Sequence, residues 1–540
     1  MAARRRWLGL TVLGFGVALV VVDITIVNVA MPSIIADLDL DFSDAAWVNA
    51  AYAVVFATFL ITLGRMGDLL GRRRLFLAGL MIFLAASLSA AGSDSLRGLV
   101  ASRALQGLGA AMILPATLAI VNATFRGRER AIAFGIWGSV IGGMAAVGPV
   151  LGGWLTTSFS WRWVFLVNVP IAVAAFIAAA AFVDESRGES TAGGFDVPGF
   201  LAASVGFSSL VLGIIEGPRF GWLTATRDLE VGDWVWPWRS LSFVPIALAV
   251  GVGAIVIFVV IENRRLRAGR FVLFDLRLFR IRSFRYGNVL AALVGLGEFG
   301  LVFVVPLYLQ TVVQYSALQT GVLFLSMAAG GFLGGPLAAY LTHRFGPRQV
   351  VSAGMSLEGL GAVGAAVVLT PTNVPLALVL ALFAYGVGVG LASSQLASVI
   401  LAEVPAAASG QASAMQSTFR QVGAALGIAM LGTIYITSMA TLTGDRLDAI
   451  AGLIPSQRIH IVDGLTDSAG WYIGALRYWT PDFRVVVVAV SESITNAARM
   501  AAAAAGAFFA VGTLLSRRLP DILREDDRSR DRSTAGADHR

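Results

Sequence analysis

The chain has 540 residues and a formal net charge of +7; apolar residues make up 57% of it and charged residues only 14%. A soluble globular domain carries roughly 25% charged residues, so this composition excludes a soluble enzyme, a nucleic-acid-binding protein and a secreted scaffold. All 40 basic residues are arginine and cysteine is absent, which excludes disulfides, thiolate chemistry and the lysine of a nucleotide-binding P-loop.

Apolar stretches of about 20 residues recur along the chain, and each is long enough to cross a bilayer core ~30 Å thick. They predict an all-α integral membrane protein with fourteen spans. In chain order the predicted spans are 8–30, 46–64, 75–92, 98–122, 132–155, 163–183, 198–216, 243–261, 286–305, 319–341, 350–369, 376–400, 413–436 and 497–516. The opening segment MAARRRW lacks a small-residue cleavage site, so we expect a retained first helix rather than a signal peptide.

The distribution of arginine predicts the orientation of the spans. With both termini inside, the inner segments carry 28 arginines and the outer segments ten. Eight of those ten lie in or beside two long loops, which count little in the positive-inside rule. We therefore expect a multi-pass protein with both termini cytoplasmic. The exclusive use of arginine over lysine is typical of a GC-rich bacterial genome, which favours the bacterial inner (cytoplasmic) membrane.

The chain repeats itself at an offset of 275 residues. The matched pairs are Gly71 with Gly346, Arg73 with Arg348, Gly148 with Gly423, Gly152 with Gly427 and Asp23 with Glu298. Parallel repeats of six spans are typical of transporters whose halves rock around a site at the midplane. The predicted domains are an N-terminal six-helix half at 1–197, two inserted transmembrane helices with an outer loop at 198–262, a C-terminal six-helix half at 263–516 with a long outer loop at 437–496, and a disordered cytoplasmic tail at 517–540. The loop at 437–496 is expected to cap the outer face, as either a short helix or a hairpin.

Two charged residues in the N-terminal half are candidates for proton coupling. A carboxylate such as Asp23 costs at least ~2.5 kcal/mol inside a span, so it normally faces a water-filled cavity or a partner. Arg103 in the fourth span must pair with an acid or with carbonyl groups, because a guanidinium does not deprotonate. We interpret the two as a coupling pair; the alternative is a pair with a purely structural role.

Two acids stand in the C-terminal half. Glu298, the repeat partner of Asp23, is expected to bind a proton or to attract a cationic substrate; the alternative is a buried acid paired locally. The position equivalent to Arg103 is Leu378, so we expect Glu298 to lack the same charge switch and assign it to cation preference. Glu358 lies in the third span of this half, a peripheral support, and is interpreted as structural.

Two glycine-rich segments predict moving parts. In GRMGDLLGRRRL, between spans two and three, Gly64 and Gly71 allow a tight turn and close helix approach. Asp68 can cap a helix end and bridge to arginines across the halves as a latch; the alternative is a simple positive-inside anchor. In GMAAVGPVLGGW, at the end of span five, glycines permit close packing and Pro149 kinks the helix, which predicts a gate.

These segments resemble the Major Facilitator Superfamily, and within it the fourteen-helix drug:proton antiporters. The inner-loop motif is met at Gly64, Asp68, Gly71, Arg72 and Arg73. The fourth-span motif is met at Leu99, Arg103, Gln106, Gly107, Gly109, Ala110 and Ala111. The antiporter gate motif is met at Gly135, Gly148, Pro149, Gly152 and Gly153, with Met144 in place of one glycine. The first-span pattern appears as Asp23, Asn28 and Pro32, and SWRWVFLVNVPI (160–171) is similar to the family's sixth span.

The resemblance implies proton-coupled export of hydrophobic, often cationic drugs by alternating access. It implies no cofactor beyond the proton motive force, no metal, membrane lipids as neighbours, no nucleic acid, and a monomer. The cavity walls would come from spans one, two, four and five with nine, ten, twelve and thirteen. Its candidate polar liners are Asn49, Tyr52, Gln106, Gln310, Tyr385 and Gln395. The alternatives are a dedicated exporter or flippase of a native lipid or secondary metabolite, and a non-transporting sensor or enzyme, against which the missing Cys, Lys and His clusters argue.

Overall fold

The computed structural model describes residues 2–40, 42–188, 196–226, 229–231, 234–238, 240–450, 453–477 and 484–520. Within these ranges fourteen helices are long and apolar enough to cross a membrane, by length and composition, as the sequence predicts. The predicted tail at 517–540 lies outside the described residues from 521 onward, as do residues 451–452 and 478–483 of the loop at 437–496.

The first six spans form one group of helices, called here the N-half. Its helices are α1 (Ala2–Leu38), α2 (Phe42–Leu70), α3 (Arg72–Ala91), α4 (Leu96–Thr124), α5 (Gly127–Ser158), α6 (Trp163–Leu166) and α7 (Asn168–Phe182). The short α6 and α7 together make the sixth span.

The last six spans form a second group, called here the C-half. Its elements are the 3-10 turn η1 (Leu276–Arg280), α10 (Arg282–Thr311), α11 (Ala317–Phe345), α12 (Pro347–Val368), α13 (Leu376–Ile400), the turn η2 (Ala406–Ala408), α14 (Ser409–Asp448) and α17 (Arg484–Ser516). Between α14 and α17 lie α15 (Pro455–Asp467) and α16 (Ile473–Leu476).

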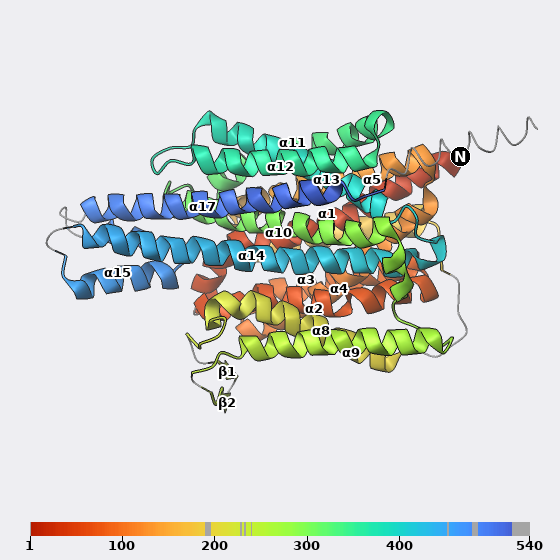
Figure 1. Cartoon of the computed structure of the whole chain (residues 1–540), viewed down its shortest axis with the longest axis horizontal. Coiled ribbons are helices and arrows are strands. Elements are labelled where there is room, and N and C mark those ends of the chain that lie inside the picture. The colour runs from red at the N-terminus through yellow and green to blue at the C-terminus, as the bar shows by residue number, and fades with distance from the viewer. Residues whose placement is uncertain are drawn as a thin grey trace, which may run out of the picture.

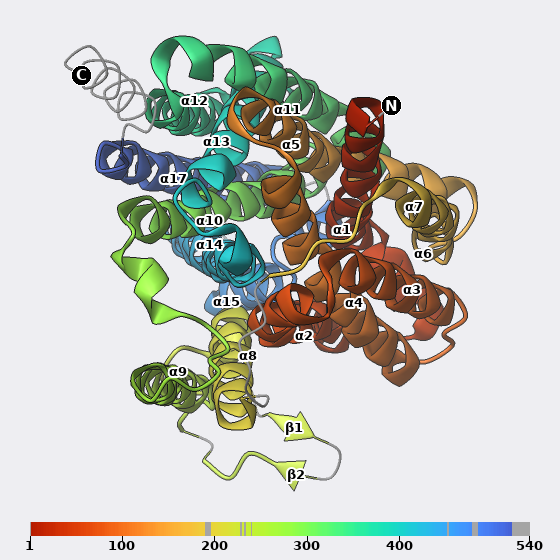
Figure 2. The ribbon, with the colours of Figure 1, turned by 90° about the vertical axis from the view of Figure 1, so that its right-hand side faces the viewer.

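Two spans are inserted between the halves, α8 (Val197–Phe220) and α9 (Val244–Arg267). They pack against each other along one edge of the bundle (Figures 1 and 2), and α8 also touches α2 and α14. In the most apolar stretch of 18 residues in α9, only 17% is buried against the rest of the protein. An apolar helix with so little protein cover is expected to face lipid.

The repeat is visible in the backbone at one turn of each half. Gly71, between α2 and α3, has φ +119°, and its repeat partner Gly346, between α11 and α12, has φ +87°. Side chains with a Cβ rarely adopt this region. The same residue type therefore reverses the chain at the same place in both halves.

The halves meet along two lines of helices, α5 with α11 and α2 with α14. Seen along the bundle, α5 and α11 lie next to each other in the upper part of the view (Figure 2). One end of the bundle carries the N-terminus and the α2–α3 turn, and is called here the latch end. The opposite end, which carries α15 and the strands β1 (Glu230–Val231) and β2 (Trp234–Val235), is called the loop end (Figure 1).

The described part of the loop at 437–496 is mainly helical, which decides between the two predicted alternatives. The spanning helix α14 continues to Asp448, α17 begins at Arg484, and α15 packs on α14. A salt bridge of 2.9 Å between Arg446 and Glu492 joins the two extensions. The hairpin forms instead in the loop between α8 and α9, where β1 and β2 pair antiparallel.

Candidate functional site

At the latch end the N-half binds the first turn of a C-half helix. The carboxylate of Asp68 in α2 accepts hydrogen bonds from the backbone N–H groups of Gly410 (2.9 Å) and Gln411 (3.1 Å) in α14. An acid at a helix N-terminus satisfies free N–H groups and complements the helix dipole. Asp68 therefore caps a helix, as predicted, and the helix belongs to the other half. Its contacts across the halves are backbone groups and not the arginines that were expected.

Arg72, which belongs to the same half as Asp68, adds further contacts to this latch. Arg72 donates to Asp68 across 2.8 Å and to the carbonyl of Ala406 in the C-half, also across 2.8 Å, and both side chains are 1% exposed or less. Arg73 turns the other way, with hydrogen bonds to Ala180 and Glu185 of its own half. The motif thus contains one arginine that reaches the partner half and one that does not.

Close backbone approach makes these contacts possible. A Cβ added to Gly64 would collide with Ala414 and with the carbonyl of Gly410 in α14. Further bonds between the halves run from Asn122 to Ser409 (2.7 Å) and from Arg130 to the carbonyl of Ser398 (2.9 Å). In this conformation the latch end is closed.

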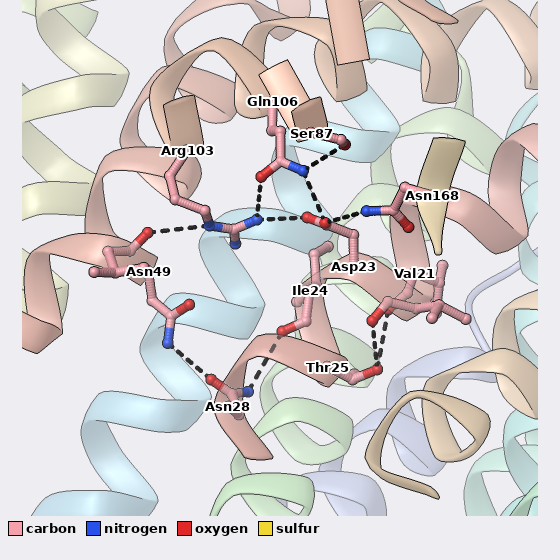
Figure 3. A network of polar contacts seen from close by, with 12 residues as sticks. Val21, Asp23, Ile24, Thr25, Asn28, Asn49, Ser87, Arg103, Gln106 and Asn168 are labelled. Atoms are coloured by element: carbon pink, nitrogen blue, oxygen red, sulfur yellow. Dashed lines mark hydrogen bonds and ion pairs between the residues drawn. The ribbon is translucent and has the colours of Figure 1, made fainter. Parts of the chain in front are cut away.

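Within the N-half, the predicted acid and arginine are in direct contact (Figure 3). Arg103 donates to Asp23 across 2.5 Å, and the two side chains are 1% and 0% exposed. Arg103 also donates to the carbonyl of Val48 (3.2 Å), and its guanidinium lies 4.5 Å from the ring centre of Tyr52. One guanidinium therefore ties α4 to α1 and α2.

Two amides complete the coordination of Asp23. Gln106 donates to it across 3.0 Å and Asn168 of α7 across 2.9 Å, and Gln106 also binds Arg103 (2.8 Å) and Ser87 (2.9 Å). In Figure 3 these side chains converge on the carboxylate from several helices. Asn168 and Ser87 were not among the predicted site residues. Asn168 carried a signal, since a polar amide inside an apolar span normally has a partner.

A cavity of about 80 Å³ lies between the halves. Its walls come from α1, α2, α4 and α5 of the N-half and from α10, α11, α13 and α14 of the C-half. These are the eight spans expected to line it. The wall is mainly apolar, with Phe56, Ile141 and Trp137 on one side and Phe299 and Met327 on the other.

The six predicted polar liners are not among the residues that line this cavity. Asn49 binds Asn28 (2.8 Å), Tyr52 and Gln106 belong to the Asp23 network, and Tyr385 and Gln395 are 0% exposed. The backbone carbonyl of Gln310 accepts a bond from Gln314 at the end of α10. The prediction names the right helices, but each helix is rotated so that a different face points into the cavity. The polar liners are Gln416, Ser417 and Gln421, together with one charged pair.

That pair is Glu298 with Arg420, so the acid is paired locally, and its arginine does not stand at the position equivalent to Arg103. Arg420 of α14 donates to Glu298 of α10 across 2.6 Å, and Ser393 of α13 bonds to both. The arginine comes from a helix other than the one that carries Leu378, so the repeat offset did not point to it. Its signal was an arginine inside a predicted span, the same criterion that singled out Arg103.

The gate motif joins α5 to one helix of each half. Gly148 and Gly152 face α1, where an added Cβ would meet Thr25 and the carbonyl of Ile26. Gly135 faces the carbonyl of Gly335 in α11, and Pro149 lies against Gly321 of the same helix. The carbonyl of Gly153 accepts from Thr157. The motif therefore holds α5 between α1 and α11, the helices on either side of the interface.

Comparison with known proteins agrees with this geometry. The profile of the Major Facilitator Superfamily matches residues 13–428. The tetracenomycin C resistance and export protein of Streptomyces glaucescens is 33% identical over 82% of this chain and 77% of its own length. The multidrug resistance protein Stp of Mycobacterium tuberculosis is 31% identical over 86% of this chain and 82% of its own.

Two further matches widen the comparison. The riboflavin transporter RibZ of Clostridioides difficile is 28% identical over 81% of this chain and 90% of its own. The crystal structure of the human organic anion transporter MFSD10 superimposes with a TM-score of 0.58, covering 94% of this chain and 99% of that one, at 15% sequence identity. At this identity the match supports the fold.

Proposed function

This chain belongs to the Major Facilitator Superfamily and is a transporter rather than an enzyme, and we propose that it exports hydrophobic small molecules in exchange for protons by alternating access. In this proposal Asp23 and Arg103 are the proton-coupling pair, Asp68 with its neighbours is the inner latch, and the cavity between the halves holds the substrate. The halves that rock are 1–197 and 263–516, with 198–262 as an accessory pair of helices.

The observation that carries the proposal is the placement of α1 between the cavity and the buried charge pair. Val21, Ile24 and Thr25 of α1 line the cavity, whereas Asp23 turns away from it toward Arg103. A substrate in the cavity and a proton on Asp23 thus act on opposite faces of one helix. Coupling then needs no direct contact between them.

The energetics favour a switch at Asp23. Removal of one partner from a buried ion pair costs about 3–5 kcal/mol, because the other charge is left uncompensated. Protonation of Asp23 removes its charge in the same way and leaves Arg103 without its counter-ion. This arrangement of α1, α2 and α4 then becomes less stable relative to another one, which is how a bound proton would drive the change of conformation.

The direction of transport follows from the expected orientation. If both termini are cytoplasmic, the latch end is the cytoplasmic end, and the conformation described here is closed to the cytoplasm. One elementary charge moving through 100 mV supplies about 2.3 kcal/mol. A single proton entering per cycle therefore supports export against a substantial gradient, without a nucleotide or other cofactor.

The cavity wall supports hydrophobic substrates with few directed polar contacts. Its amide side chains, Gln416 and Gln421, can both donate and accept hydrogen bonds. Relatives named for resistance to several drugs favour a broad substrate range. A second candidate is a dedicated exporter of one secondary metabolite or lipid, favoured by the 33% identical relative that is named for export of tetracenomycin C.

The test uses the purified protein in proteoliposomes with an imposed pH gradient, and a panel of two hydrophobic dyes, a polyketide and a fluorescent lipid. We expect the gradient to drive accumulation of both dyes, with loss of accumulation when a protonophore is added. Transport of the polyketide or lipid alone would instead establish the dedicated exporter. Dye transport that does not respond to the protonophore would overturn proton coupling.

A further inference from the structure

A second buried carboxyl group lies behind the cavity and has no part in the mechanism above. Glu358 of α12 is 0% exposed, and neither carboxylate oxygen has a hydrogen-bond partner among the residues that the structure describes. By contrast, Asp23 accepts from three side chains and Glu298 from two. Buried polar groups without a partner are uncommon in folded proteins, and each one calls for an explanation.

The position of Glu358 is set by close packing against α13. A Cβ added to Gly388 of α13 would lie 2.6 Å from the backbone nitrogen of Glu358 and 2.8 Å from its Cγ. The phenol of Tyr385, one turn earlier on α13, is also 0% exposed and without a hydrogen-bond partner among the described residues. The two groups interact electrostatically with each other and with Glu298 and Arg420.

The other helices packed against α12 bring no counter-ion to this place. The titratable groups of α11 are Tyr340, His343 and Arg344, all at its latch end. Those of α17 are Arg484 and Glu492 in its extension and Arg499, which binds the carbonyl of Leu369 and the side chain of Asn496. Arg348 lies in the first turn of α12, at the latch end, away from Glu358 in the middle of the helix. The one nearby guanidinium, Arg420, is already bonded to Glu298.

An ionised carboxylate without donors or counter-charge carries a large desolvation cost, and such groups take up a proton instead. The cluster in the C-half then consists of a neutral Glu358, a negative Glu298 and a positive Arg420, with no net charge. Loss of one proton from Glu358 gives the same cluster a net charge of −1. Glu298 and Arg420 line the cavity, and Glu358 packs on α13, which lines it through Val389.

From this geometry we propose that Glu358 is a second proton-binding site, whose proton is exchanged for a positively charged substrate. The inference rests on the proposed proton-coupled export. It names Glu358 as the group that distinguishes cationic from neutral substrates. A cation entering the cavity is stabilised by the deprotonated cluster, and a proton returning to Glu358 restores neutrality and favours release of the cation. Charge and mass balance, since one proton leaves Glu358 for each cation bound.

The proposal makes stoichiometry depend on the substrate. A neutral substrate exchanges for the proton of Asp23 alone, whereas a monocation exchanges for the protons of Asp23 and Glu358. Both exchanges move one net positive charge inward per cycle, so a membrane potential drives both. Without Glu358, a monocation exchanges for one proton and its export becomes electroneutral.

The experiment measures export of one neutral compound and one monocation by the full-length protein in proteoliposomes, driven by a potassium-valinomycin potential at equal pH. We expect Glu358→Gln to lose potential-driven export of the monocation and to keep that of the neutral compound, which shows that the variant is folded and coupled. Glu216→Gln is the matched control, because Glu216 is a buried acid paired with Arg219 in α8, outside both halves, and both exports should be unchanged.

Potential-driven export of the monocation by Glu358→Gln at the wild-type rate would overturn the inference. Wild-type protein that exports neither compound under a potential or a pH gradient would overturn the proposed function instead. If Glu358→Gln cannot be purified, proton release on substrate binding to the wild type decides the matter. We expect two protons per monocation and one per neutral molecule, and equal numbers would contradict the second site.

Discussion

The carboxylate of Asp68 accepts a 2.9 Å hydrogen bond from the backbone N–H of Gly410, so an acid of one half caps a helix of the other. Hydrogen bonds to charged groups contribute about 1.5–3 kcal/mol each. Asp68→Asn keeps the shape and loses the charge, so we expect the closed latch end to lose stability by about that amount. Spin labels on cysteines introduced at both sides of the latch should show a shift toward the open distance of at least about tenfold. The natural chain has no cysteine to remove.

The neighbouring arginine supplies the control for this variant. Arg73 carries a charge in the same turn but bonds only within its own half. Arg73→Gln should leave the distance distribution unchanged, whereas Arg72→Gln should shift it. Equal shifts in the Arg73 and Asp68 variants would show that the basic turn acts as a general membrane anchor rather than as a latch.

Steric closure at the latch end is testable independently of charge. Gly64→Val places a Cβ where it collides with Ala414 and the carbonyl of Gly410, and we expect it to hold the latch end open and to abolish transport. Gly253→Val is matched as a glycine within a spanning helix, but a Cβ there meets nothing within 4 Å. It should transport normally. A functional Gly64→Val protein would mean that the two helices need not approach this closely.

The ion pair of the C-half predicts a non-additive effect on stability. Arg420→Gln leaves Glu298 buried and uncompensated, and the expected loss is about 2–3 kcal/mol, below the 3–5 kcal/mol of a fully buried pair because the Arg420 side chain is 20% exposed. Glu298→Gln should cost less, since Arg420 keeps Ser393 and reaches solvent. The double variant should be more stable than Arg420→Gln alone. Thermal unfolding of the four proteins in detergent measures the cycle, and additive losses would show that the pair is not coupled.

At the loop end, an ion pair between Asp37 and Arg162 predicts that the stability of the protein depends on pH. Hydrogen bonds from Trp161 and Arg162 lower the pKa of Asp37 below its ordinary value of 3.8. A lowered pKa in the folded state stabilises the protein above the ordinary pKa, and this contribution is lost as the pH falls through the lowered value. The unfolding temperature of Arg162→Gln should therefore lie below that of the wild type at pH 6, with the gap narrowing as the pH falls below the ordinary pKa of 3.8. A gap that is constant from pH 6 to pH 3 would contradict this role of Asp37.

The membrane architecture could be predicted from the sequence because each span is a continuous apolar run, and hydropathy needs no knowledge of neighbours. The contact of Asp23 with Arg103 was also predictable, since two opposite charges inside spans of one half have few other ways to lower their free energy. The ends of the helices were less well placed. The prediction placed residues 437–448 and 484–496 in a loop, yet they continue α14 and α17 beyond the predicted spans.

The partners of Asp68 and the liners of the cavity could not be predicted, for two physical reasons. Every residue except proline has a backbone N–H group, so the residue types at the start of α14 gave no indication that Gly410 and Gln411 bind Asp68. The face that a helix presents depends on its rotation, which is set by packing across the interface, so Gln416 and Gln421 rather than Tyr385 and Gln395 reach the cavity. Arg420 and Asn168 were omissions that the sequence could have prevented, because each is a polar side chain inside a predicted span.

The most direct test of coupling through Asp23 is proton-driven uptake into inside-out membrane vesicles, compared with substrate counterflow in the same vesicles without a gradient. Asp23→Asn removes the charge that Arg103 binds and keeps the size of the side chain. We expect it to abolish uphill uptake of every substrate, neutral or cationic, because protonation of Asp23 drives the change of conformation and the proton of Glu358 does not. Counterflow should be retained, because the cavity lies on the other face of α1. Uphill uptake by Asp23→Asn at the wild-type level would contradict the assignment of proton coupling to this pair.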